Sequence, residues 1–289
     1  MVDDAASHEE GLFTLNDGKR EMVDEERAKV MVAAALRGRD PASITRVCLS
    51  NKSYSSEAAA VIGEALNEMT SVTDVDFSDM IAGRPEETGL AVLRAVCGGV
   101  AGRRSYLEWV DLSDNAMGQK GIDACRDCLE QGQGRLRALL LCNDGLSEAA
   151  MGAVRDLLLA HKPTSLRTLH FYNNMSGDGG AHALAEVLPH CPELEDLRFS
   201  GTRAGRKGSV AVAKALADCP AVASGKLVRL DLADNTFGAD EGAEALAKAI
   251  KSQPELAFLN LRDCALEDDG TAAVAGALSS PTCARLLRH

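Results

Sequence analysis

A leucine-rich pattern that recurs eight times constrains the fold of this chain more than any other feature of its 289 residues. Residues 107–115 (LEWVDLSDN) and 227–235 (LVRLDLADN) share the form LxxLxLxxN. The same frame begins eight units, spaced 28 to 35 residues apart, at positions 44, 72, 107, 136, 166, 194, 227 and 256. Such self-similarity predicts a stack of small structural units rather than one large core.

Alanine-rich stretches separate these patterns, and their apolar residues recur at helical spacing, as in residues 57–67, 148–160 and 241–251. Small side chains allow neighbouring helices to pack closely, and only 3% of the residues are aromatic, which suits thin stacked layers. Each unit is therefore predicted to form one strand and one helix. The expected fold class is α/β: a leucine-rich-repeat solenoid of the ribonuclease-inhibitor-like horseshoe type, with parallel inner strands and outer helices.

Two regions are predicted: residues 1–43 as an N-terminal cap segment with a helical run over 21–36, and residues 44–289 as a repeat domain of about eight repeats. The sequence stops where a ninth strand is due, so we expect a shortened C-terminus or a capping partner. Two units carry extra residues, 80–89 between strand and helix and 221–226 after a helix. Loops of this kind on a rigid scaffold commonly carry function, although a neutral insertion explains them equally well.

The formal net charge of −12 argues against binding to nucleic acid, since phosphate neutralisation needs clustered lysine and arginine. An acidic surface favours a basic protein partner. We expect acidic strand residues to line the inner face of the repeats: Asp76, Glu108, Asp111, Glu195, Asp196 and Asp231. No stretch approaches the roughly 20 apolar residues of a membrane span, and the acidic N-terminus is unlike a secretory signal. A cytoplasmic protein without membrane insertion is therefore predicted.

The sequence shows no signature of a catalytic, metal or cofactor site. Cys125 and Cys128 have CxxC spacing but lack a second ligand pair, and the nine cysteines as a whole are typical of buried, reduced thiols. The histidines form no HExxH motif, and the glycines form no phosphate-binding loop of the GxxxxGKS/T type. We therefore expect no bound metal or cofactor, and no nucleotide held by this chain itself.

Several consecutive motifs are more specific than the repeat pattern. Residues 76–87 (DFSDMIAGRPEE) resemble a strand and loop of the Ran GTPase-activating proteins (RanGAP) in their plant and green-algal form. The likeness extends from about residue 13 to 280, and further similar motifs follow in the order of that family: residues 13–31, 112–118 (LSDNAMG), 142–147 (CNDGLS), 170–175 (HFYNNM) and 199–203 (FSGTR).

The resemblance implies an activator of GTP hydrolysis by the small G protein Ran, and with it a part in nucleocytoplasmic transport. Members of the family insert no arginine finger, because Ran supplies the glutamine that orients the attacking water and also holds GTP and magnesium. The chain would then regulate an enzyme without being one. The expected partners are Ran-GTP and, together with it, a Ran-binding protein.

The resemblance also assigns residues. Arg84 matches an arginine in the loop after the second strand, and Asn143 matches an asparagine after the fourth strand that lies near the glutamine of Ran. Arg203 matches a basic residue that contacts Ran. Further candidates for the partner interface are the turn residues Asp79, Asp114, Asn173 and Asp234.

The residue seven positions after the start of each unit is Asn or Asp in seven units and Gly201 in the other. Such residues bond local backbone groups and cap the following helix, which is the structural explanation for most of the set. Asn143 differs, because Asp144 follows it at the position that Asn115 and Asn235 hold in their units. Asp144 is expected to take the packing role, so that Asn143 faces outward, where its amide can both donate to and accept from a glutamine.

Arg84 lies between Gly83 and Pro85, and the proline biases the residue before it to extended geometry, which reduces the freedom of the side chain. The guanidinium can form a salt bridge with Glu86 or Glu87, or it can reach a carboxylate or phosphate of a partner. The sequence favours docking and positioning and leaves a true arginine finger open.

Two other functions are compatible with the sequence. One is a leucine-rich-repeat scaffold or inhibitor that binds a protein without changing any GTPase, and the other is a hydrolase with an unrecognised site. In localisation, plant RanGAP proteins carry a Trp-Pro-Pro domain that directs them to the nuclear envelope. No such motif occurs in this sequence, so the cytoplasm is predicted and association with the nuclear envelope is the alternative.

Overall fold

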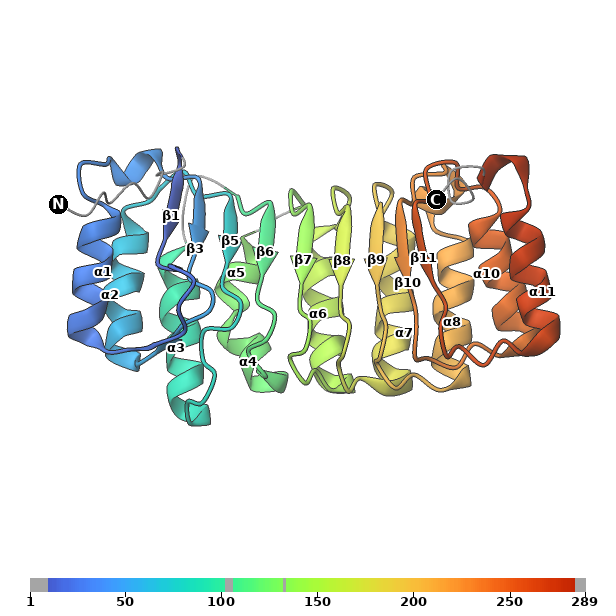
Figure 1. Cartoon of the computed structure of the whole chain (residues 1–289), viewed down its shortest axis with the longest axis horizontal. Helices are drawn as coiled ribbons and strands as arrows, with labels where there is room; N and C mark the ends of the chain where they lie inside the picture. Colours follow the sequence, from blue (N-terminus) through green and yellow to red (C-terminus); the bar gives the residue numbers. More distant parts are fainter. Residues whose placement is uncertain (1–9, 102–105, 132–133, 284–289) are drawn as a thin grey trace. The chain divides into compact units, whose positions relative to one another are not determined.

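The chain forms two compact units, seen here in a computed structural model that describes residues 10–101, 106–131 and 134–283. The first unit comprises Met1–Val110 with Ala124–Gln131, and the second comprises Asp111–Asp123 with Gly132–His289. Within each unit, parallel strands form one layer and helices form the other (Figure 1). The predicted class, an α/β leucine-rich-repeat fold, is thus confirmed.

In the first unit, strands pair through equivalent positions of successive repeats. Phe13 aligns with Val47, and Val47 with Val75, and all three side chains are buried. The strands are β1 (Leu12–Thr14), β2 (Met22–Val23), β3 (Arg46–Cys48), β4 (Ser53–Tyr54), β5 (Asp74–Asp76) and β6 (Trp109–Asp111), the last of which contains the boundary between the units. The helices are α1 (Glu25–Ala35), α2 (Ser56–Asn67), α3 (Glu86–Gly99) and α5 (Arg126–Glu130), with a 3-10 turn at Pro41–Ser43.

The second unit continues the same arrangement. Leu139, Leu169, Leu197 and Leu230 align across neighbouring strands and are buried. The strands are β7 (Ala138–Leu140), β8 (Thr168–His170), β9 (Asp196–Arg198), β10 (Arg229–Asp231) and β11 (Phe258–Asn260). The helices are α4 (Gly118–Ala124), α6 (Glu148–His161), α7 (Gly177–Val187), α8 (Arg206–Ala217), α9 (Pro220–Ala223), α10 (Ala243–Ile250) and α11 (Glu267–Leu278), with short helical turns at Leu188–His190, Gly238–Gly242 and Pro281–Cys283.

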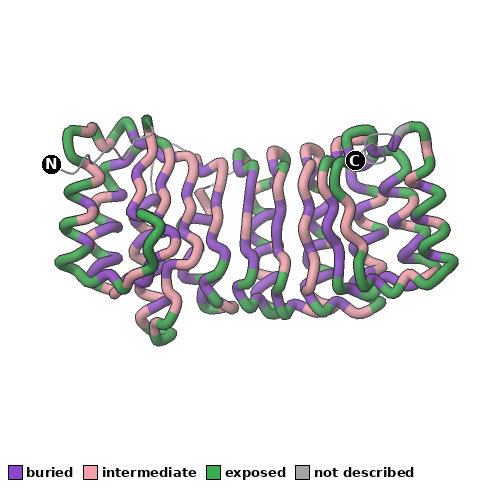
Figure 2. The backbone as a smooth tube through the Cα atoms, in the orientation of Figure 1, coloured by how far each residue is buried: buried purple, intermediate pink, exposed green. Residues whose placement is uncertain are grey.

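All eight predicted repeats are present, because a strand begins two residues after each predicted start. The leucines of the pattern form the core, as Leu227, Leu230 and Leu232 illustrate with no exposed surface. In β3, β5, β6 and β9, a buried central residue lies between two partly exposed ones (Figure 2). Small residues bring the helices together: a Cβ on Gly63 of α2 would lie 2.6 Å from the carbonyl oxygen of Ala95 in α3.

The N-terminal segment differs from its prediction in two respects. The helix predicted from residue 21 begins at Glu25, because Asp24 caps it by accepting a hydrogen bond from the Arg27 N–H at 2.9 Å. The segment also contributes β1, which the sequence did not reveal since this strand lacks the repeat frame. The first part of the predicted cap segment, residues 1–9, and the C-terminal residues 284–289, where a shortened C-terminus was expected, lie outside the described residues.

The two extra segments are short extensions of the repeats. In residues 80–89, Met80 is buried and its carbonyl accepts from the Tyr54 N–H at 3.1 Å, while the later residues already belong to α3. In residues 221–226, the first three residues complete α9. Neither segment forms a long free loop.

The cysteines occur as free thiols, and eight of the nine are buried. Burial, together with neighbouring thiols, raises the pKa of several of them, as with Cys191 at about 12. In the part of the chain that the structure describes, no cluster of three or more His, Cys, Asp or Glu residues is arranged to hold a metal ion. The described helices also include none with both the length and the hydropathy needed to cross a membrane.

Candidate functional site

A row of left-handed turns follows the strands, and it explains the residue types that the sequence showed. The residue seven positions after each repeat start has a φ between 51° and 63° in all eight repeats: Asn51, Asp79, Asp114, Asn143, Asn173, Gly201, Asp234 and Asp263. This backbone conformation costs about 1–2 kcal/mol for most residues, and Gly, Asn and Asp tolerate it best. Gly201 is therefore no exception, because it meets the same requirement.

Helix capping, the explanation expected for most of these turn residues, is wrong for Asn51, which precedes α2, and Asn143, which was set apart from that explanation, does not cap α6. The caps of these helices are Ser55, which accepts from the Ala58 N–H at 3.1 Å, and Ser147, which accepts from the Ala150 N–H at 3.3 Å. The side chains of the turn residues are consequently available for contacts along the row.

The next residue of each repeat points inward. Asn115, Asn174 and Asn235 are buried, and Asp144 is buried at the equivalent position of its own repeat. Asn143, by contrast, is exposed. The prediction that Asp144 takes the packing role and that Asn143 faces outward is confirmed.

Three turn residues of the second unit are joined by side-chain hydrogen bonds. Asn143 Nδ2 donates to Asp114 Oδ1 at 2.8 Å, and Asn173 Nδ2 donates to Asn143 Oδ1 at 2.8 Å. We call Asp114, Asn143 and Asn173 the amide row. These bonds fix which way the Asn143 amide faces, and they leave it one N–H and one carbonyl lone pair for a partner.

Two further exposed side chains lie in the turns next to the amide row. Arg203, at φ 61°, is exposed and has no side-chain hydrogen bond or ion pair among the described residues. Met175 is 58% exposed and follows Asn173 by two residues, a contact surface that the sequence gave no reason to single out. Asp234 pairs with Arg262 at 3.2 Å. Of the predicted residues in this unit, Arg203 is thus a cation available to a partner, whereas Asp234 already has a partner in the chain.

The predicted residues of the first unit are bound within that unit. Arg84 Nη2 donates to the main-chain carbonyl of Ser53 at 2.5 Å, and its Nε is buried without a hydrogen-bond partner among the described residues. The Arg84 side chain is therefore held by a main-chain carbonyl and not by the predicted salt bridge to Glu86 or Glu87. Asp79 pairs with Arg20 of the N-terminal segment. Arg84 and Asn143 belong to different units.

The strand face of the second unit corrects the expectation of an acidic lining. Asp196 lies 3.0 Å from His170 Nε2 and 3.7 Å from Arg229 Nε, and Asp231 lies 3.5 Å from Arg198 Nε. The sequence showed the carboxylates but not the cations that the parallel register places beside them. This part of the face carries paired charges and therefore does not attract a basic partner by net charge alone.

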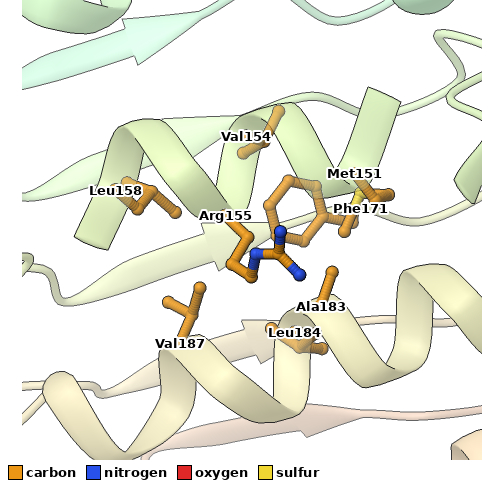
Figure 3. Close-up of a pocket in the computed structure, with 8 residues that line it drawn as sticks. All are labelled: Met151, Val154, Arg155, Leu158, Phe171, Ala183, Leu184 and Val187. Carbon is orange, nitrogen blue, oxygen red and sulfur yellow. The ribbon is translucent and has the colours of Figure 1, made fainter. Parts of the chain in front are cut away.

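An apolar hollow between α6 and α7 is unsuited to chemistry (Figure 3). Its lining consists of Met151, Val154, Arg155, Leu158, Phe171, Ala183, Leu184 and Val187. Arg155 is the one polar residue of this set, and its guanidinium pairs with Asp156 at 2.8 Å. The lining offers no nucleophile, general base or ligand for a metal. Of the two features, the amide row is the better candidate for function.

Comparisons with known proteins agree with this structure. A model of the Leucine Rich repeat family matches residues 225–247. A crystal structure of a Bacteroides fragilis protein is similar in fold, with a TM-score of 0.50 and 14% sequence identity over 91% of this chain and 72% of that one. This likeness supports the fold alone.

Two curated proteins of Arabidopsis thaliana are similar in sequence. RAN GTPase-activating protein 1 is 41% identical over 113 residues, which is 39% of this chain, and RAN GTPase-activating protein 2 is 37% identical over 126 residues, which is 43% of it. The matched parts make up 20% and 22% of those relatives, so the chain spans about one fifth of their length. The predicted resemblance is confirmed: this chain has a leucine-rich-repeat fold and is similar in sequence, over about two fifths of its length, to Ran GTPase-activating proteins of a plant.

Proposed function

We propose that this chain activates GTP hydrolysis by Ran, and that Asn143 does so by positioning the catalytic glutamine of Ran. The relatives named RAN GTPase-activating protein support Ran as the partner. The observation that carries the proposal is the amide row, in which Asn143 is exposed and its amide already oriented by Asp114 and Asn173.

The chemistry belongs to the G protein in this proposal. A glutamine of the GTPase orients the attacking water, and its mobility limits the slow intrinsic reaction. The free N–H and the free lone pair of the Asn143 amide match the acceptor and the donor of a glutamine carboxamide. Because Asp114 and Asn173 already hold the Asn143 amide, little conformational entropy is lost when it binds, and the gain appears in the rate.

Arginines dock the partner in this account. The guanidinium of Arg84 donates to the Ser53 carbonyl, which limits its reach, and we assign it a docking contact with Ran at the first unit in place of a finger in the nucleotide site. Arg203 has no partner within the described chain and can pair with a carboxylate of Ran. GTP and magnesium stay on Ran, and a Ran-binding protein joins the complex. We place this activity in the cytoplasm, as a part of nucleocytoplasmic transport.

The release of phosphate from Ran loaded with GTP, in which each Ran molecule hydrolyses its bound GTP once, tests the proposal. A catalytic amount of the chain should accelerate release, and the acceleration should saturate as Ran is increased. Binding of Ran-GTP without acceleration would favour the alternative, a scaffold or inhibitor built on the same repeats. Release of phosphate from GTP in the absence of Ran would instead indicate a hydrolase.

A further inference from the structure

Each buried asparagine of the second unit donates to main-chain carbonyl oxygens in the same way. Asn174 Oδ1 accepts from the main-chain N–H groups of Asp144 and Leu146 at 3.1 Å, and its Nδ2 donates to the carbonyls of Leu141 and Phe171 at 2.8 Å. The same donation to main-chain carbonyls is made by the other two buried asparagines, Asn115 and Asn235. An amide fits this place because it accepts on one side and donates on the other.

Asp144 fills the same place with a carboxyl group. Its Oδ1 accepts from the Asn115 N–H at 2.9 Å, as the amide oxygen of Asn174 does in the next repeat. Its Oδ2 is buried without a hydrogen bond among the described residues. Because Oδ1 takes the part of the asparagine oxygen, we infer that Oδ2 corresponds to the asparagine Nδ2. An ionised carboxylate would offer only lone pairs at a position where its neighbours donate to carbonyl oxygens, and burying such a group is costly.

The surroundings of Asp144 oppose a negative charge. The side chain has no exposed surface. Burial raises the pKa of Asp144 well above its usual range, and the carboxylates of Asp114 and Asp111 raise it further, while main-chain hydrogen bonds at Asn115 and Ala116 act in the opposite direction. The buried thiol of Cys142 is coupled to it as well. The groups that shift the pKa of Asp144 most include no cation.

We propose that Asp144 is a neutral carboxylic acid in the folded protein, and that its O–H donates to a main-chain carbonyl where the neighbouring repeats use an asparagine N–H. The protonated side chain completes the row of buried hydrogen bonds beneath the Asn143 turn. It thereby keeps Asn143 in register with Asp114 and Asn173. The importance of this positioning rests on the proposed function, whereas the protonation itself does not.

The proposal fixes the direction of a pH effect. In the unfolded chain, the carboxyl of Asp144 loses its proton near pH 4. The folded chain keeps the proton above that pH, so the stability is fully present below about pH 4 and is lost as the pH rises toward the folded pKa. Asp144→Asn supplies a permanent N–H and removes this loss.

Urea unfolding of the wild type and of Asp144→Asn between about pH 5 and pH 8 tests the inference. The unfolding equilibrium constant of the wild type, divided by that of the variant, should rise about tenfold per pH unit, or about 1.4 kcal/mol. Asn174→Asp places an acid in the adjacent buried position and should create a second slope of the same sign. Asp268→Asn makes the same change on an exposed helix residue and should leave the ratio constant. A ratio for Asp144→Asn that does not change with pH overturns the proposal.

The protonation state of Asp144 can also be measured directly, without comparing the stabilities of variants. In protein labelled with carbon-13 at the aspartate carboxyls, the signal that disappears in Asp144→Asn should have the chemical shift of a carboxylic acid at neutral pH. A carboxylate shift for that signal overturns the proposal. Neither measurement involves a G protein, so failure to activate Ran and failure of the buried acid are distinguished.

Discussion

The turns after the strands differ between the two units in what their side chains bind. In the first unit, Asp79 pairs with Arg20, and Arg84 donates to the Ser53 carbonyl. In the second unit, Asp234 pairs with Arg262, but the side chains of the amide row bond to one another, and Arg203 has no partner in the described chain. The left-handed backbone is the same in both units, so the difference comes from the side chains that surround the turns.

The buried position next to each turn shows the same contrast. In the first repeat of the first unit this position holds Lys52, whose ammonium group contacts Asp17 Oδ1 at 2.6 Å, the Lys19 carbonyl at 2.5 Å and Glu21 Oε1 at 3.2 Å, while the second repeat has the apolar Met80 there. In the second unit the equivalent Asp144 has only main-chain donors. The N-terminal segment thus supplies the groups that satisfy the first unit, and no such segment covers the described turns of the second.

This difference separates stability from function. Lys52 and the Arg20–Asp79 pair hold the N-terminal segment of the first unit in place, and their loss should cost stability. Arg84 is the first-unit side chain to which we assign a contact with Ran. The exposed groups of the second unit contribute little to folding and remain available to a partner. Substitutions at equivalent positions of the two units can therefore test whether the separation is real.

The largest effect is expected at Asn143. Asn143→Gly removes the amide but suits the left-handed turn, so the fold should persist while the activation of Ran falls about 100-fold, as expected when a positioning group is lost. Asn51→Gly is the matched control, because Asn51 holds the same turn position in the first unit at φ 60°. Single-turnover phosphate release measures both variants. Equal losses in the two would show that the amide row has no special role.

The second largest effect is expected at Lys52, and it is a loss of stability of the first unit. Lys52→Ala removes a fully buried ammonium and leaves Asp17 and Glu21 facing each other, which we expect to cost about 2–3 kcal/mol. This is below the usual cost of breaking a buried pair because both carboxylates are partly exposed. Hydrogen exchange of the N–H groups in residues 15–24 measures the loss. Unchanged exchange there would contradict the role assigned to Lys52.

Low pH should also destabilise the first unit, but less than the loss of Lys52 does. The hydrogen bond from Lys52 lowers the pKa of Asp17 below its usual value. A lowered folded pKa means that the stability is present above the unfolded pKa and is lost as the pH falls through the folded one. The first unit should thus weaken in acid, whereas the second unit, through Asp144, loses stability as the pH rises.

Arg84 should have a smaller effect than Asn143. Arg84→Ala should lower kcat/KM for Ran-GTP about tenfold, mainly through KM, because a docking contact stabilises the ground state and the transition state alike. Arg94→Ala, on the exposed side of α3, is the control for lost positive charge. A fall in kcat of about 1,000-fold or more would instead indicate an arginine finger.

The sequence predicted those features that depend on spacing within one repeat. All eight strands follow the expected starts, because burial at alternate strand positions determines where the leucines occur. The outward Asn143 also followed from its own unit, since Asp144 stands at the buried position that Asn115 and Asn235 hold in their units.

Contacts between repeats were beyond the sequence argument. The pairing of Asp196 with Arg229, and the bond from Arg84 to Ser53, depend on which residues of successive repeats become neighbours. One signal was overlooked: Lys52 stands where Asn115 stands in its own unit, and a charged residue at a buried position requires partners that the chain must supply.

The smallest effect is expected at Arg20, and it examines the contrast between the units most closely. Its pair with Asp79 is half exposed, with 48% of the Arg20 side chain accessible, and pairs of this kind contribute less than about 1 kcal/mol. Arg20→Ala should therefore lower the unfolding free energy by about 0.5 kcal/mol, and the loss should shrink at high salt. Chemical denaturation at low and high ionic strength measures both. A loss above about 2 kcal/mol, independent of salt, would mean that Asp79 is fixed as firmly as Lys52 and that the first-unit turn serves folding alone.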